Sequence, residues 1–230
     1  EIYTLWHALS LHDALPIYMG EIKNEYYLKP KVIKGVVDVL LELGMKPFLF
    51  DSIVLYRGSR HTKKLYYETA EKHGFTEKTM GCPIVISDEG IEVKEEDMTV
   101  KVCKELVGVD CLLNISHVKG HCCYGFGGAI KNLGMGGVLP ESKKEIHQAK
   151  EISTDKLLAE GAKAVWKQFE KVFNVNFIIN IAKECDCMNN AGPIIADDIG
   201  VLFGKDVAAI DKASIDLVYE QKPGIFEKYH

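Results

Sequence analysis

Two histidines and a Cys-X-Cys motif are the residues of this sequence whose types and spacing best suit metal chemistry. His117 and His121 stand four residues apart in the stretch SHVKGHCCYGFGGAIKNLGMGG, and Cys185 and Cys187 follow later in the chain. Imidazole nitrogen and thiolate sulfur together suit iron, zinc, nickel or copper. A glycine between the histidines favours a loop, which can still turn both imidazoles toward one ion. We predict a metal site with the ligands His117, His121, Cys185 and Cys187; a structural role for one histidine is the alternative.

The Cys-X-Cys motif belongs to the stretch ECDCMNNAGPIIADDIG, residues 184–200. In an extended segment its two side chains would point to opposite faces. In a loop, both thiolates can reach one metal ion or cluster, or form a redox pair, and a basic neighbour would favour the thiolate form. Buried inert thiols are the alternative. Cys122 and Cys123, which directly follow His121, are reserve ligands.

The glycine-rich stretch GFGGAIKN, residues 125–132, can present backbone amides and a lysine to an anion. The start of a helix binds carboxylate or phosphate groups through its unbonded N–H groups. The stretch is not a P-loop, because GxxxxGK(S/T) is absent, and it lacks the third glycine and the downstream acid of a dinucleotide fingerprint. Glycines required by a crowded turn are the alternative. The predicted anion-binding residues are Arg57, Lys119, Gly127, Gly128, Asn132, Asp51 and Asp198.

The same residues support a second hypothesis, an enzyme that acts on a small anionic substrate. Histidine titrates near neutral pH and therefore suits a general acid or base. The predicted catalytic residues are His117, His121 and Lys131, and Arg57 in YRGSR would grip a carboxylate or phosphate. A hydrolase, an isomerase or a racemase would fit. For Arg57, a solvated helix start is the alternative.

Alternating helices and strands must position these residues. Helical periodicity predicts helices over 30–44, 60–73 and 206–221, and one or two helices over 142–173. Glycines end the first two, and Asp206 caps the start of the last. Apolar runs predict strands over 46–51, 82–88, 90–94, 110–117, 174–184 and 195–204, whereas 98–107 fits either a helix or an extended segment. The alternation predicts one α/β domain with a mostly parallel sheet and helices on both faces. Ligands bind beyond the carboxyl ends of such strands, which is where Asp51, His117 and Cys185 fall.

Composition narrows the function classes. The net charge of −5 and the pI of about 5.9 argue against nucleic-acid binding, which leaves a basic surface. The sequence has neither an apolar run of about 18 residues nor a basic and apolar secretory leader, so we expect no membrane association. Seven cysteines, an odd number, are more typical of intracellular thiols than of a disulfide framework. We therefore expect a cytoplasmic protein.

The first 18 residues, EIYTLWHALSLHDALPIY, differ from the pattern that follows. SLHDALPI reads as translated sequencing adaptor of the kind found in assembled environmental sequences. We predict that residues 1–18 are non-native and that the core domain spans 19–230, the native protein having lost its first strand. A genuine amphipathic N-terminal helix is the alternative.

Four separated blocks in this order resemble one known family. They are GEIKNEYYLKP, KPFLFDSIVLYRGSR, SHVKGHCCYGFGGAIKNLGMG and CDCMNNAGPIIADDIGVLFGKDVAAIDKASIDLV. Over about residues 19–221 the chain is similar to the uncharacterised iron–sulfur centre family, domain of unknown function 362. The resemblance implies a metal- or iron–sulfur-binding redox protein. It also implies a chain that stops early, since relatives tend to continue beyond GIFEKYH.

The sequence departs from the family pattern in one respect. Many relatives carry a ferredoxin-like module after the glycine-rich block, but no cysteine stands between Gly137 and Trp166 here. The ligands of a ferredoxin-type cluster are therefore missing. A weaker likeness, to the lactate racemase family, implies a nickel-containing cofactor. We expect a cluster or a single iron, zinc or nickel ion as cofactor, and a small anionic molecule or a redox protein as partner; a homo-oligomer is compatible with the sequence.

Overall fold

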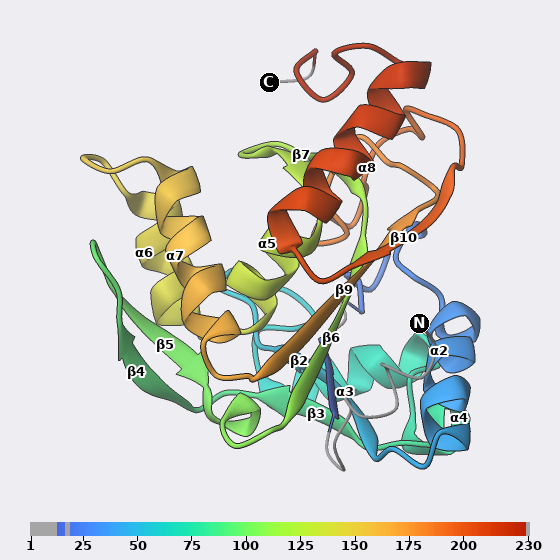
Figure 1. Cartoon of the computed structure of the whole chain (residues 1–230), viewed down its shortest axis with the longest axis vertical. Helices are drawn as coiled ribbons and strands as arrows, with labels where there is room; N and C mark the ends of the chain where they lie inside the picture. The colour runs from blue at the N-terminus through green and yellow to red at the C-terminus, as the bar shows by residue number, and fades with distance from the viewer. Residues whose placement is uncertain (1–12, 17–18, 229–230) are drawn as a thin grey trace.

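A six-stranded sheet forms the centre of the computed structural model (Figure 1), which describes residues 13–16 and 19–228. Its strand order is β10-β9-β6-β1-β2-β3. The strands are β1 (Asp13–Pro16), β2 (Pro47–Ser52), β3 (Ile84–Ser87), β6 (Cys111–His117), β9 (Lys171–Ile178) and β10 (Gly200–Gly204). All neighbours pair in parallel except β10, which runs antiparallel to β9 at the edge. The predicted mostly parallel α/β sheet is confirmed.

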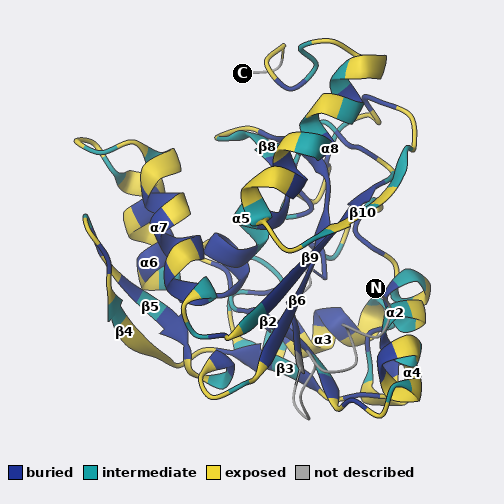
Figure 2. Ribbon diagram, in the orientation of Figure 1, coloured by how far each residue is buried: buried dark blue, intermediate teal, exposed yellow. Residues whose placement is uncertain are grey.

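Helices cover both faces of this sheet, as predicted, because side chains alternate between two apolar layers. One layer contains Leu49, Leu113 and Val175 and packs on α2 (Pro30–Glu42), α3 (Lys63–Lys72) and α4 (Glu77–Met80). The other contains Leu112 and Val172. It packs beneath α6 (Pro140–Gln148) and α7 (Thr154–Trp166), with α5 (Ala129–Lys131) and α8 (Val207–Gln221) beside them. Figure 2 shows β6 and β9 buried between these layers.

Two small antiparallel hairpins complete the fold. β4 (Gly90–Lys94) pairs with β5 (Thr99–Cys103), followed by the 3-10 turn η1 (Lys104–Leu106). The stretch 98–107, left open by the sequence, is therefore largely extended. β7 (Lys119–His121) pairs with β8 (Gly125–Gly127), and a π-helical turn, η2 (Asn132–Gly136), follows α5. No helix among the described residues is long and apolar enough to cross a membrane.

The stretch 142–173, predicted as one or two helices, contains most of α6 and all of α7, but the prediction extends too far. α7 stops at Trp166, and Lys171–Phe173 already belong to β9, where Val172 pairs with Leu112. Phe169, Val172 and Phe173 continue the apolar pattern across the turn, so periodicity alone does not mark the boundary. Apolar residues also continue past the ends of two predicted strands. The strand predicted over 174–184 ends at Ile178, and the strand predicted over 195–204 begins only at Gly200.

The N-terminal segment contributes to the sheet. Residues 13–16 form β1, which pairs with β2 on one side and β6 on the other, and Ala14 and Leu15 are buried. Residues 1–12 and 17–18, on which the adaptor and helix interpretations mainly depend, lie outside the described residues. The origin of the segment stays a prediction.

Candidate thiolate and metal site

The β7–β8 hairpin and the loop that carries the Cys-X-Cys motif meet at the carboxyl end of β6. The loop leaves β9 and folds back across the hairpin, where the amide of Gly120 donates to the carbonyl of Ala182 at 2.9 Å. A Cβ atom at Gly120 would lie 2.1 Å from the carbonyl oxygen of Lys183. Only glycine permits this approach of the two backbones. The glycine between the two histidines therefore fixes the loop against the hairpin.

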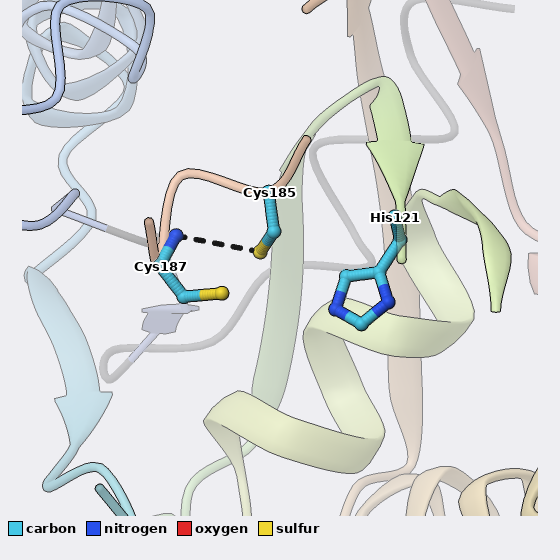
Figure 3. A group of neighbouring side chains, drawn as sticks. All are labelled: His121, Cys185 and Cys187. Atoms are coloured by element: carbon cyan, nitrogen blue, oxygen red, sulfur yellow. Dashed lines mark hydrogen bonds between the residues drawn. The ribbon is translucent and has the colours of Figure 1, made fainter. Parts of the chain in front are cut away.

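His121, Cys185 and Cys187 form the centre of the site. One ligand atom from each lies within 4.8 Å of the other two, and a ring nitrogen of His121 points toward the two sulfur atoms (Figure 3). His121 and Cys185 are 3% and 1% exposed, which removes both from bulk water. The Cys187 amide donates to Cys185 Sγ at 3.4 Å, and Lys131 Nζ donates to the same sulfur at 3.6 Å. We call His121, Lys131, Cys185 and Cys187 the thiolate site.

Electrostatics make Cys185 the ionised member of the pair. A hydrogen bond donated by the Cys187 thiol and the Lys131 charge hold the pKa of Cys185 well below its usual value, although burial opposes this. The same hydrogen bond and burial raise the pKa of Cys187. Burial would lower the pKa of Lys131, but the two sulfurs raise it instead. The two thiols therefore share one proton, and a buried ammonium–thiolate pair results.

His121 is held as a neutral imidazole with a defined orientation. Burial and the nearby Lys131 charge lower its pKa. Its Nδ1 accepts the amide N–H of Cys123 at 3.1 Å, so the ring proton lies on Nε2. The other nitrogen faces the sulfurs, where Nε2–H donates toward the Cys185 thiolate.

His117 lies apart from this site, although the sequence grouped the two histidines. Its Nδ1 is 3.0 Å from Oδ2 of Asp186, and its Nε2 is 2.8 Å from the carbonyl oxygen of Ile179. Lys119 Nζ donates to the same carboxylate at 2.8 Å. Burial would raise the pKa of Asp186, but the His117 and Lys119 charges lower it to about 2. These contacts hold Asp186, the middle residue of the Cys-X-Cys motif, against β6 and β7.

The glycine-rich stretch holds an anion that belongs to the chain itself. The amides of Ala129 and Ile130 donate to the two carboxylate oxygens of Asp211 on α8, at 2.7 and 2.9 Å. A Cβ atom at Gly128 would lie 2.4 Å from Oδ1 of Asp211. The glycine is therefore required by close approach, and the start of α5 is occupied by this carboxylate.

Asp211 lies among charged residues in the middle of its helix, a setting typical of a surface side chain, but it is buried. The helical spacing does indicate this burial. One face of α8 is buried, and it carries Asp211, Ser214 and Val218. Asp206 caps α8 as predicted, its carboxylate accepting from the amides of Ala208 and Ala209.

Asn132, one of the predicted anion-binding residues, holds the helix that carries Lys131 in place. Its side-chain amide donates to Asn114 Oδ1 at 2.7 Å and to the carbonyls of Pro16 and Ile115, each at 3.1 Å. Asn114 in turn donates to Asn174 on the neighbouring strand. Satisfied buried amides of this kind fix geometry.

A cavity of about 20 Å³ adjoins the thiolate site. Its lining brings together predicted residues from both hypotheses, among them His117, Lys119, Gly127, Gly128, Lys131, Asn132 and Cys185, with Ser116 beside them. Ser116 Oγ is buried with no hydrogen-bond partner among the described residues. The space suits about one water-sized group.

Comparison with known proteins places the chain in a family. The model of the family described as "Domain of unknown function (DUF362)" matches residues 15–216. The chain belongs to this family. No curated protein matches it. The family description assigns no metal and no activity to this DUF362 member.

Two solved structures share the fold of this DUF362 chain. A protein from Thermotoga maritima is 13% identical, with a TM-score of 0.61 over 95% of this chain and 57% of its own. The lactate racemase apoprotein from Thermoanaerobacterium thermosaccharolyticum is also 13% identical, with a TM-score of 0.55 over 90% of this chain and 48% of its own. The DUF362 chain thus spans about half the length of these proteins, and the likeness concerns the fold.

The remaining predicted site residues lie elsewhere in the DUF362 fold. Asp51, at the end of β2, is buried; it accepts the amide of Ser52 at 2.7 Å and the hydroxyl of Tyr66. Arg57 is exposed at the surface. Asp198 accepts the amide of Asn180 at 2.6 Å. None of the three belongs to the group that His121 forms with the cysteines.

Asp51 belongs to a buried cluster that the sequence did not reveal. Arg60, which is fully buried, pairs with Glu21 at 3.2 Å, and Lys143 donates to Ser52 Oγ at 2.8 Å. Burial raises the pKa of Asp51 and lowers that of Lys143 to about 8, although each charge favours the other. We call Glu21, Asp51, Arg60, Tyr66 and Lys143 the β2 cluster.

Proposed function

We propose that this protein binds a single transition metal ion through His121, Cys185 and Cys187. The observation that carries the proposal is the convergence of one imidazole and two sulfurs within 4.8 Å in a buried loop. Membership of the DUF362 family and the fold shared with a lactate racemase apoprotein are compatible with it. Three protein ligands leave one coordination position of a four-coordinate ion open, and a small anion or a group from a redox partner can fill it.

The donor set fits one ion better than a cluster. Two sulfurs and a nitrogen suit zinc, iron or nickel. A [4Fe–4S] cluster takes four thiolates, whereas each histidine and cysteine group among the described residues contains two. Lys131 offsets the negative charge of the sulfurs, and a bound ion would supply Lewis acidity, or electron transfer if it were iron or nickel.

Metal binding makes one demand on the hairpin. Nε2 of His121 faces the sulfurs but carries the ring proton, because Nδ1 accepts the Cys123 amide. For Nε2 to act as a ligand, the proton must move to Nδ1, and the Cys123 amide must turn away. We therefore expect the amide of Cys123 to shift on metal binding, which an NMR comparison of the two states would detect.

Metal and acid-labile sulfide analysis of protein purified without oxygen tests the proposal. We expect about one metal ion per chain without sulfide, and its loss in the Cys185→Ser/Cys187→Ser variant. Cys82→Ser is the control, because Cys82 is a buried thiol that belongs to none of the metal groups. Iron with stoichiometric sulfide would contradict a single ion, and metal retained by the double variant would contradict these ligands.

A second candidate is an enzyme that acts on a small anion with Cys185 as nucleophile. It is favoured by the contacts of Cys185, whose thiolate meets Lys131 and Nε2–H of His121, an arrangement that activates thiols. Cys185 is 1% exposed, so such a substrate would have to be very small. Alkylation of Cys185 in metal-free protein at neutral pH would favour this candidate if a small carboxylate protects the thiol from the reagent.

A further inference from the structure

Cys122 and Cys123 form a second pair of thiols on the outer side of the thiolate site. They lie in the turn between β7 and β8, and both are exposed. Their Sγ atoms are 3.6 Å apart, close enough for both to bind one ion. None of the seven cysteines forms a disulfide in the described chain.

His121 is common to both pairs of cysteines. It forms one compact group with Cys185 and Cys187 and another with Cys122 and Cys123, and in each group the ligand atoms lie within 4.8 Å of one another. The first group is largely buried and the second opens to solvent at the cysteines. The imidazole therefore stands between a surface dithiol and an interior one.

The interior group has little direct access to solvent. His121 and Cys185 are almost fully buried, and the adjoining cavity has room for about one water-sized group. The dithiol, by contrast, borders a surface cavity of about 410 Å³ that also contains Tyr219 and Phe226. That cavity can hold the organic part of a small metal complex while the ion contacts the thiols.

We propose that Cys122 and Cys123 are the loading site for a thiophilic metal ion, which passes by way of His121 to Cys185 and Cys187. The handover rests on the proposed function. It is a ligand exchange without oxidation or reduction. Cys122, Cys123 and Cys187 each release one proton when they bind the ion, whereas Cys185 binds as the thiolate that it already is, and each surface thiolate that lets the ion go takes one proton up. Because new sulfur ligands bind before old ones leave, the free ion need not enter the interior.

Cobalt(II) binding to the full chain under anaerobic conditions tests this inference, with stopped-flow absorption as readout. The Cys122→Ser/Cys123→Ser variant keeps the backbone amide on which His121 depends. We expect this variant to reach the same final cobalt content and spectrum as the wild type, but at least severalfold more slowly. Cys82→Ser should load at the wild-type rate. Equal rates for the Cys122→Ser/Cys123→Ser variant and the wild type would overturn the inference.

The interior variant separates this inference from the proposed function. In Cys185→Ser/Cys187→Ser we expect cobalt in excess to bind the surface dithiol with a different spectrum and to come off on gel filtration. This binding should be lost when Cys122 and Cys123 are also changed. If the interior variant has the wild-type spectrum and content, the proposed function fails, and the handover with it. If the interior variant binds no cobalt, the dithiol is not a loading site, while the interior site stands.

Discussion

Two buried clusters of ionisable groups occupy the same edge of the sheet, and only one has the contacts of a reactive site. In the β2 cluster each charge meets an opposite charge, as in the Arg60–Glu21 pair. In the thiolate site a soft nucleophile, Cys185, receives donors from Lys131, His121 and Cys187. Burial and perturbed pKa values are therefore common to both clusters, whereas only the thiolate site has a polarisable acceptor surrounded by donors.

The β2 cluster has a structural explanation. Its members join the loop of residues 21–24 and α3 to the end of β2, and Tyr66 bridges Asp51 and Arg60. The loop also supports the thiolate site, since the amide of Glu21 donates to the carbonyl of Asp186 at 2.9 Å. We therefore expect changes in the β2 cluster to act on stability first, and changes in the thiolate site to act on reactivity.

The largest effect on stability is expected for Arg60→Ala. It leaves Glu21 buried without its partner, and breaking such a pair lowers the free energy of unfolding by about 3–5 kcal/mol. Urea unfolding measures it. The exposed Arg57→Ala, three residues away, is the matched control and should change the value by less than about 0.5 kcal/mol. Equal effects of the two variants would contradict the structural role of the cluster.

Acid titration of Asp186 should have the next largest effect. Its pKa of about 2 in the folded chain is below the usual 3.8, so its contribution is complete above about pH 4 and is lost as the pH falls toward 2. The difference amounts to about 2 kcal/mol. Unfolding measured between pH 2 and 5 should therefore show a shallower loss of stability in Asp186→Asn. An unchanged slope would mean that His117 and Lys119 do not hold the carboxylate as described.

Asp211→Asn should lower the free energy of unfolding by about 1–3 kcal/mol, because a side-chain NH₂ group cannot accept a backbone N–H of α5. The control is Asp206→Asn on the same helix. It should lower the free energy of unfolding by only about 0.3 kcal/mol, because asparagine caps helices as well as aspartate does. Thermal unfolding of both variants checks this. If the two variants are equally stable, Asp211 is not the anion that fills the glycine-rich turn.

The smallest effect on stability, with the clearest effect on chemistry, is expected for Lys131→Met. Without the ammonium group Cys185 can take up a proton, so the fold is retained while the pKa of Cys185 rises. The ultraviolet absorbance of the thiolate against pH, taken as the difference from Cys185→Ser, measures the shift. Lys119→Met should shift the profile less, because Lys119 bonds directly to Asp186. A larger shift for Lys119→Met would reverse their assigned roles.

The fold was largely predictable because it depends on local pattern. Apolar runs such as 110–117 became buried strands, and the capping residue Asp206 marked α8. Boundaries failed where apolar residues continued through a turn, as at Phe169. Strand positions predicted that polar residues would gather at the carboxyl edge, and His121, Lys131 and the two cysteines of the motif do so.

The partners of these residues were not predictable, because they come from distant parts of the chain. Asp186 meets His117 across 69 positions, and Asp211 meets Ala129 across 82. Spacing shows which residues can share a face but not which carboxylate will fill a glycine-rich turn. His117 and His121 illustrate the limit, since their side chains, four residues apart, make different contacts.

The X-ray absorption spectrum of the metal-loaded protein, at the edge of the bound metal, is the most direct test of the proposed metal site. We expect two sulfur neighbours at about 2.3 Å together with imidazole nitrogen. In protein gel-filtered to remove metal from the surface dithiol, both sulfur neighbours should be absent in Cys185→Ser/Cys187→Ser and present in Cys122→Ser/Cys123→Ser. A first shell of oxygen and nitrogen alone, or sulfur neighbours that persist in Cys185→Ser/Cys187→Ser, would contradict a metal site at His121, Cys185 and Cys187.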